Sequence, residues 1–150
     1  MSFRSAVLVV ATTAIPAVLH AQASPAAQTR PYTEGSVWDI SMIRTADGMA
    51  DDYLRSLGTT WKRMLDEAKK QGLVLSYKVI SASTSGPNDW DILLMVEYKN
   101  WAAFDGLADK MDPVEQKVIG NEDQQRQLMT KRLEIRHILG DKTGQELILK

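Results

Sequence analysis

Two segments of the chain carry apolar side chains on both of their alternating faces, and this pattern constrains the fold more than any other. In residues 35–45, GSVWDISMIRT, Trp38, Ile40 and Met42 would point to one face while a valine and an isoleucine point to the other. Residues 90–98, WDILLMVEY, are apolar on both faces as well. Such strands are typical of the centre of a sheet that is covered on both sides. We therefore predict that both segments are central strands.

A helix is expected between these two segments. Residues 49–71 place apolar side chains at three- and four-residue spacing, Asp47 can cap the start, and Gly72 can adopt the left-handed conformation that ends a helix. Residues 73–84 then predict a second strand. Residues 85–89, SGPND, predict the turn that reverses the chain into the third strand.

The last third of the chain predicts a second helical region. Asn100 can cap a helical stretch, and Asp112 followed by proline, valine and glutamate is typical of a new helix start. We expect that helix to reach about Lys131, with a weak point at 120–121. The remaining elements are a fourth strand at 133–139, a hairpin turn at 140–144 and a short fifth strand at 146–150.

The resulting order is strand-helix-strand, twice. The tripeptide Trp-Asp-Ile begins both central segments, at 38–40 and 90–92, and suggests two halves of one pseudo-symmetric unit. Right-handed crossovers would make these strands a parallel central pair and place both helices on one face of the sheet. The other face would be apolar and bare, so we expect a second copy of the chain to cover it in a sheet-to-sheet homodimer.

These features resemble the dimeric α/β-barrel superfamily of ferredoxin-like domains, and especially its small exported bacterial members, which end in a pattern similar to RHILG at 136–140 and QEL at 145–147. The resemblance covers residues 36–150. It implies an α+β fold of the split β-α-β kind (βαββαβ), with a four-stranded antiparallel sheet, helices on one face and a barrel completed by the dimer. It implies no single activity, because the architecture hosts monooxygenases, haem-degrading enzymes, dismutase-like haem proteins and non-catalytic binders.

The first 23 residues have the pattern of a secretory signal peptide. Arg4 supplies the positive start, residues 6–18 the apolar core, and Ala21-Gln22-Ala23 the small-x-small cleavage site. An uncleaved anchor is the alternative, but the apolar run is too short to span a bilayer. The predicted parts of the chain are a signal peptide at 1–23, a flexible mature N-terminus at 24–35 and one domain at 36–150.

The net charge of −1 and the absence of cysteine exclude several classes of protein. The sequence has no basic stripe of the kind that binds nucleic acid. Its longest basic cluster, Lys131-Arg132 followed by Arg136, fits a solvated helix end. Without cysteine there is no thiol nucleophile, thiolate metal site or lipid-modified cysteine. We expect an exported protein, in the periplasm or the medium, with no nucleic-acid partner and no membrane contact once the leader is removed.

His137 is the only histidine outside the predicted leader. It is a weak candidate for a catalytic residue, as a proton shuttle or haem ligand, although a solvated or satisfied histidine on an edge strand is the commoner situation. A single imidazole makes a histidine-based metal site very unfavourable. We predict no metal site and no cofactor.

Aromatic side chains are the other candidates. Trp38, Tyr53, Trp61 and Trp90, together with Tyr77, could line a pocket for a flat, apolar ligand, although core packing also explains large aromatics at these positions.

The sequence leaves three hypotheses about function open. The first is an exported homodimer that holds a small hydrophobic molecule or has no catalysis. The second is a cofactor-independent, monooxygenase-like or haem-handling enzyme that uses His137. The third is a partner-binding role through the strand at 146–150, which could add to another sheet or be exchanged between protomers.

Overall fold

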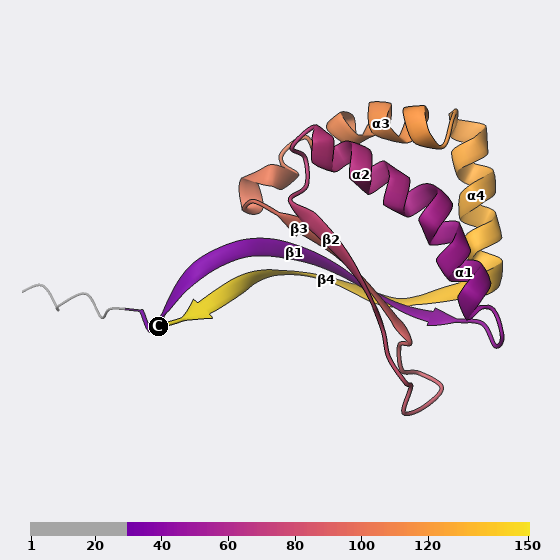
Figure 1. The fold of residues 1–150 in the computed structure, drawn as a ribbon, viewed down its shortest axis with the longest axis horizontal. Helices are drawn as coiled ribbons and strands as arrows, with labels where there is room; N and C mark the ends of the chain where they lie inside the picture. Colours follow the sequence, from indigo (N-terminus) through magenta and orange to yellow (C-terminus); the bar gives the residue numbers. More distant parts are fainter. Residues whose placement is uncertain (1–29) are drawn as a thin grey trace, which may run out of the picture.

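The computed structural model describes residues 30–150 and shows one four-stranded sheet (Figure 1). The predicted signal peptide and the first half of the predicted flexible segment, residues 24–29, lie outside the described residues. The strand order is β2-β3-β1-β4, and every neighbouring pair is antiparallel. The strands are β1 (Tyr32–Thr45), β2 (Ser76–Ser81), β3 (Ile92–Tyr98) and β4 (Arg136–Leu149).

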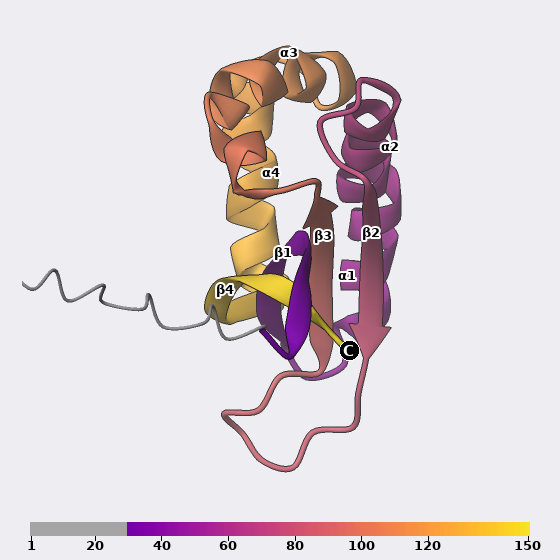
Figure 2. The ribbon, with the colours of Figure 1, turned by 90° about the vertical axis from the view of Figure 1, so that its left-hand side faces the viewer.

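The helices lie on one face of this sheet (Figures 1 and 2). The first helical region runs without a break from Ala50 to Lys70, as predicted, and its middle is a π-helical turn. Asp47 does not cap it, because the residue before the helix is Met49. The helical elements are α1 (Ala50–Ser56), η1 (Leu57–Trp61), α2 (Lys62–Lys70), η2 (Trp101–Phe104), α3 (Leu107–Val118) and α4 (Glu122–Ile135).

The two Trp-Asp-Ile segments are the central pair, but the prediction that they run parallel is wrong. β1 and β3 are antiparallel, with Trp38 opposite Glu97 and Ile43 opposite Ile92. The helical crossover makes β2 parallel to β1, and the turn between β2 and β3 then reverses the direction once more. β3 therefore enters between β1 and β2 in the opposite direction, which gives the ferredoxin-like order.

The predicted hairpin at 140–144 and the separate fifth strand are also wrong. β4 is one strand of 14 residues, because β1 begins already at Tyr32, inside the segment predicted to be flexible, and pairs with β4 over almost its whole length. Leu139 is the extra residue of a bulge in β4, next to Gly140. A Cβ on Gly140 would lie 3.2 Å from the Met42 Cε, so glycine here serves close strand contact and not a turn.

The helix predicted to start at Asp112 begins earlier, and the second helical region ends later, than predicted. α3 starts at Leu107, after Gly106 in the left-handed conformation, and passes through Pro113 because its apolar side chains pack on the core. The predicted weak point is confirmed as a break between two helices. There the Asn121 side chain accepts a hydrogen bond from the Gln124 backbone N–H, and α4 continues to Ile135.

The core between helices and sheet has two parts joined by Trp61. Both contain side chains from β3, and Trp61 packs against both. The part under α2 and α3 consists of Leu65, Ala68, Val74, Val96, Tyr98 and Val114. The part under α1 consists of Ile43, Tyr53, Leu57, Ile92 and Leu94.

No described helix covers the opposite face of the sheet (Figure 1), and the strand register places an apolar patch on that face. Alternate residues of β3 are buried against the helices, so Leu93 and Met95 face the other way. The register places side chains from β1 and β2 on the same open face. We call this set the open-face patch: Trp38, Ile40, Met42, Ile80, Leu93 and Met95.

Candidate functional site

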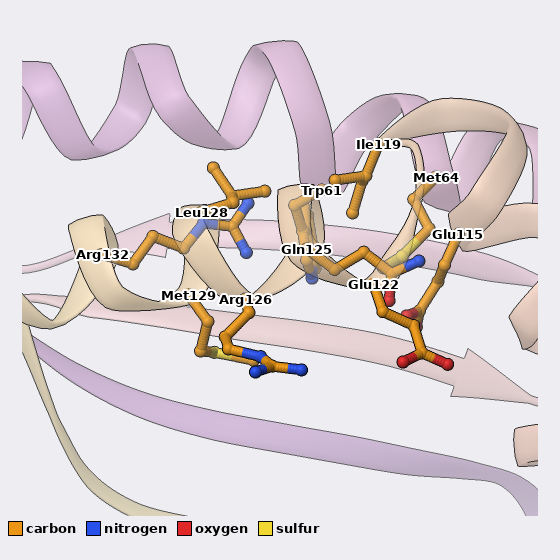
Figure 3. Close-up of a pocket in the computed structure, with 10 residues that line it drawn as sticks. All are labelled: Trp61, Met64, Glu115, Ile119, Glu122, Gln125, Arg126, Leu128, Met129 and Arg132. Carbon is orange, nitrogen blue, oxygen red and sulfur yellow. The ribbon is translucent and has the colours of Figure 1, made fainter.

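A cavity of about 430 Å³ lies between α2, the end of α3 and α4 (Figure 3). Its walls are mainly apolar, with charged groups at the ends. The side chains that line it are Trp61, Met64, Glu115, Ile119, Glu122, Gln125, Arg126, Leu128, Met129 and Arg132.

The π-helical turn η1 positions one wall of this cavity. A π turn adds a residue to the helix and changes the direction of the side chains that follow. The Thr60 hydroxyl donates a 2.6 Å hydrogen bond to the Ser56 carbonyl oxygen, which fixes this turn. Trp61, the last residue of η1, then stands edge-on to Tyr77 of β2, with ring centroids 5.3 Å apart. Its indole lines both the main cavity and a smaller one of about 190 Å³.

The two ends of the cavity carry opposite charge (Figure 3). Arg132 lies at one end, and Glu115 and Glu122 lie at the other. Burial, with a smaller contribution from the charge of Asp112, raises the pKa of Glu115 above its usual value. A bound molecule would therefore meet an arginine at one end, and at the other the poorly solvated Glu115 carboxyl and the exposed Glu122 carboxylate.

Arg132 lies near the end of α4, and Arg136 is the first residue of β4. The side chain of Arg136 is buried, and that of Arg132 is half-buried. Arg136 is only 7% exposed, and its guanidinium lies over the Tyr53 ring, 5.6 Å from the centroid. Arg132 donates a hydrogen bond to the Thr60 hydroxyl. Burial lowers the pKa of Arg132 below its usual value. Tyr53 acts in the opposite direction, and the positive charge of Arg136 lowers the pKa further.

Only one of the aromatic residues singled out from the sequence lines the main cavity, namely Trp61. Tyr53 is buried under Arg136, where burial raises its pKa. Trp38 lies in the open-face patch, with the Lys78 ammonium 4.8 Å from its ring centroid. Trp90 is half-buried just before β3. The structure therefore does not gather these four residues in one pocket.

His137 is exposed on β4, opposite Arg44 of β1. By the register of the sheet it belongs to the open face, away from the cavity. Over residues 30–150, no three His, Cys, Asp or Glu side chains come together where they could hold a metal ion.

Arg132 and Arg136 are the site residues that sequence reasoning assigned to solvent. The assignment of Arg136 to a solvated helix end is wrong, because α4 ends at Ile135 and Arg136 enters the sheet opposite Thr45. No local pattern in the sequence marks Arg136 for burial, because it lies in extended backbone beyond the end of α4.

Comparisons with known proteins add the following. No family model and no curated protein matches the chain. Solved structures that resemble it include HapK from Hahella chejuensis (19% identity, 73% of this chain and 91% of that one, TM-score 0.45). A dimeric ferredoxin-like protein from an uncultured marine organism matches at 15% identity, over 79% of this chain and 98% of that one, with a TM-score of 0.48. A nipsnap family protein with unknown function from Agrobacterium tumefaciens matches at 15% identity, over 77% and 90%, with a TM-score of 0.42.

In the part of the chain from residue 30 onward, no helix has the length and apolar character needed to cross a bilayer.

The strand order itself assigns the fold. Four antiparallel strands in the order β2-β3-β1-β4 form an open sheet with its helices on one face. The chain is thus an α+β protein with a ferredoxin-like fold.

Proposed function

We propose that this chain binds a small, mainly apolar molecule in the cavity between α2, α3 and α4, without transforming it. The observation that carries the proposal is the cavity itself. Its volume of about 430 Å³ falls within the range of roughly 300–1,000 Å³ that is typical of small-molecule sites. Trp61, Met64 and Leu128 supply an apolar wall, and a few polar groups at the ends supply orientation.

The lack of a catalytic arrangement at this cavity favours binding over chemistry. The chemically versatile His137 is exposed on the other side of the sheet, so it cannot pass a proton to a molecule held beside Trp61. The enzyme alternative would need a different group at the cavity. Glu115 is the one lining residue with a raised pKa, and no described nucleophile is hydrogen-bonded to it.

We also propose that the binder is an exported homodimer. The leader pattern at 1–23 supports export. The open-face patch supports the dimer, because six apolar side chains on one sheet face would otherwise stay in contact with water. A second copy related by a two-fold axis would present the same patch and cover both.

A fluorescence titration tests the binding proposal. The probe is N-phenyl-1-naphthylamine, a neutral aromatic amine whose emission rises in apolar surroundings. Leu128→Trp fills the cavity, and Leu133→Trp places the same side chain on an exposed part of α4 as the matched control. We expect the wild-type chain and the control to bind the probe below about 100 μM, which is about −5.5 kcal/mol. The filled variant should bind at least tenfold more weakly; equal binding by all three chains would refute the proposal.

A further inference from the structure

Two arginine side chains, the buried Arg136 and the half-buried Arg132, have buried donors without a partner. The Nε and Nη1 atoms of Arg136 and the Nε of Arg132 have no hydrogen-bond partner and no contact with solvent. None of the ion pairs within residues 30–150 includes either arginine. Buried guanidinium groups are normally paired with a carboxylate or a phosphate.

The surrounding residues do not neutralise these charges. The Arg136 guanidinium lies over the Tyr53 ring, which gives its Nε and Nη1 donors no hydrogen-bond partner. Asp91 lies near Tyr53, but its carboxylate accepts hydrogen bonds from the backbone N–H and the hydroxyl of Thr45. Since arginine is not deprotonated in proteins, the two positive charges persist after burial. A bound anion would supply the missing partner.

The cavity brings a bound anion to Arg132, one of these two arginines. Arg132 lines the end of the cavity and also holds one of the unsatisfied donors. Arg136 follows it by four residues, and its charge lies near enough to affect Arg132. At the opposite end lie the carboxyl groups of Glu115 and Glu122, with the Arg126 guanidinium pointing toward Glu122 (Figure 3), so it is the unpaired donors of Arg132 and Arg136 that favour an anion at their own end.

We propose that the ligand of this cavity is an amphipathic carboxylate, whose head binds Arg132 with the charge of Arg136 behind it, and whose apolar body lies against Trp61, Met64 and Leu128. This inference rests on the proposed binding function and names the chemical class of the ligand. The planar fork of Arg132 suits a carboxylate, which can accept two parallel hydrogen bonds from it.

Competition between matched compounds tests the inference. Octanoate, 1-octanol and octylamine have the same apolar chain and differ in their heads, and each is titrated against the bound neutral probe. We expect wild-type protein to bind octanoate at least tenfold more tightly than 1-octanol; octylamine reports binding in the reverse orientation, with its ammonium at Glu115 and Glu122.

Variants then assign the preference to one side chain. Arg132→Met should bring the affinity for octanoate down to that for 1-octanol and leave the affinity for 1-octanol unchanged. Lys131→Met removes the same charge from the exposed neighbour and should keep the preference. Arg132→Lys retains the charge without the fork and should keep part of it.

The outcomes separate the two proposals, and the wild-type comparison alone is decisive if a variant does not fold. Equal displacement by octanoate and 1-octanol would overturn the carboxylate inference and leave the binding function standing. If neither compound displaces the probe, or the probe itself does not bind, both proposals fail. A preference that survives in Arg132→Met would overturn the assignment to this arginine.

Discussion

The guanidinium of Arg136 lies over the ring of Tyr53, with its central carbon 5.6 Å from the ring centroid. Both residues are almost fully buried, and they come from β4 and α1, which are far apart in the sequence. A cation–π contact of this kind offsets part of the cost of burying a charge, but it leaves the Nε and Nη1 donors of the arginine unpaired. The end of the cavity is therefore positively charged and short of acceptors.

Replacing Arg136 by methionine should stabilise the ligand-free protein. The change removes a buried charge without a partner and keeps most of the side-chain volume, so we expect the free energy of unfolding to rise by roughly 1–3 kcal/mol. Urea denaturation measures it, and Lys131→Met should change the value by less than about 0.5 kcal/mol. A loss of stability in Arg136→Met would mean that the guanidinium already has adequate partners.

Trp61 should be a major contributor to stability, because it joins the two parts of the core. We expect Trp61→Ala to lower the free energy of unfolding by about 2–4 kcal/mol. Trp101, which is 50% exposed, provides the matched control, and Trp101→Ala should cost less than about 1 kcal/mol. Similar losses in the two variants, measured by denaturant unfolding, would argue against a bridging role for Trp61.

The raised pKa of Glu115 predicts a specific pH dependence. In the folded state burial favours the protonated form, so folded protein binds more protons than unfolded protein just above pH 4.5, the usual value of the group. Stability should therefore fall as the pH rises from below that value through the higher folded pKa. Glu115→Gln removes this loss, so its melting temperature should exceed that of wild type at pH 7 and match it at pH 3.5.

The exposed Glu122, which lines the same end of the cavity, provides the control for this pH effect. Glu122→Gln should follow the wild-type pH profile. If Glu115→Gln gained nothing at pH 7 relative to pH 3.5, the carboxyl group would not be desolvated.

The open-face patch should hold two copies of the chain together. Met95 lies on the central strand β3 within this patch, and a lysine there would place a charge at the centre of the proposed interface. We expect wild-type protein to have twice the mass of one chain by light scattering, and Met95→Lys to have the mass of one chain. Leu133→Lys, on α4, should remain dimeric; a monomeric wild-type protein would contradict the dimer.

Local sequence patterns predicted the first half of the fold well. Helical spacing in 49–71 and the strand patterns on either side needed no knowledge of distant residues, and the crossover followed from them. The errors came where distant partners decide. Gly140 and Gly144 resemble turn residues, but they lie within a strand because residues 32–45 provide a partner along its whole length.

The site was harder to predict than the fold, because it depends on which side chains are buried together. Arg136 carries no local mark of burial; it is buried because the strand that follows α4 enters the sheet beside α1. In the same way, sequence alternation groups Trp38 with Ile40 and Met42 but does not say which face the helices cover. The register shows that this face is the open one.

The most direct test of the account is the position of the bound molecule among the four tryptophans. A two-dimensional ¹H–¹⁵N spectrum resolves their indole N–H signals, which single Trp→Phe variants assign. Addition of octanoate should shift the signal of Trp61, in the cavity wall, and leave those of Trp38, in the open-face patch, and Trp101, on η2, in place. Movement of the Trp38 signal without that of Trp61 would contradict the account.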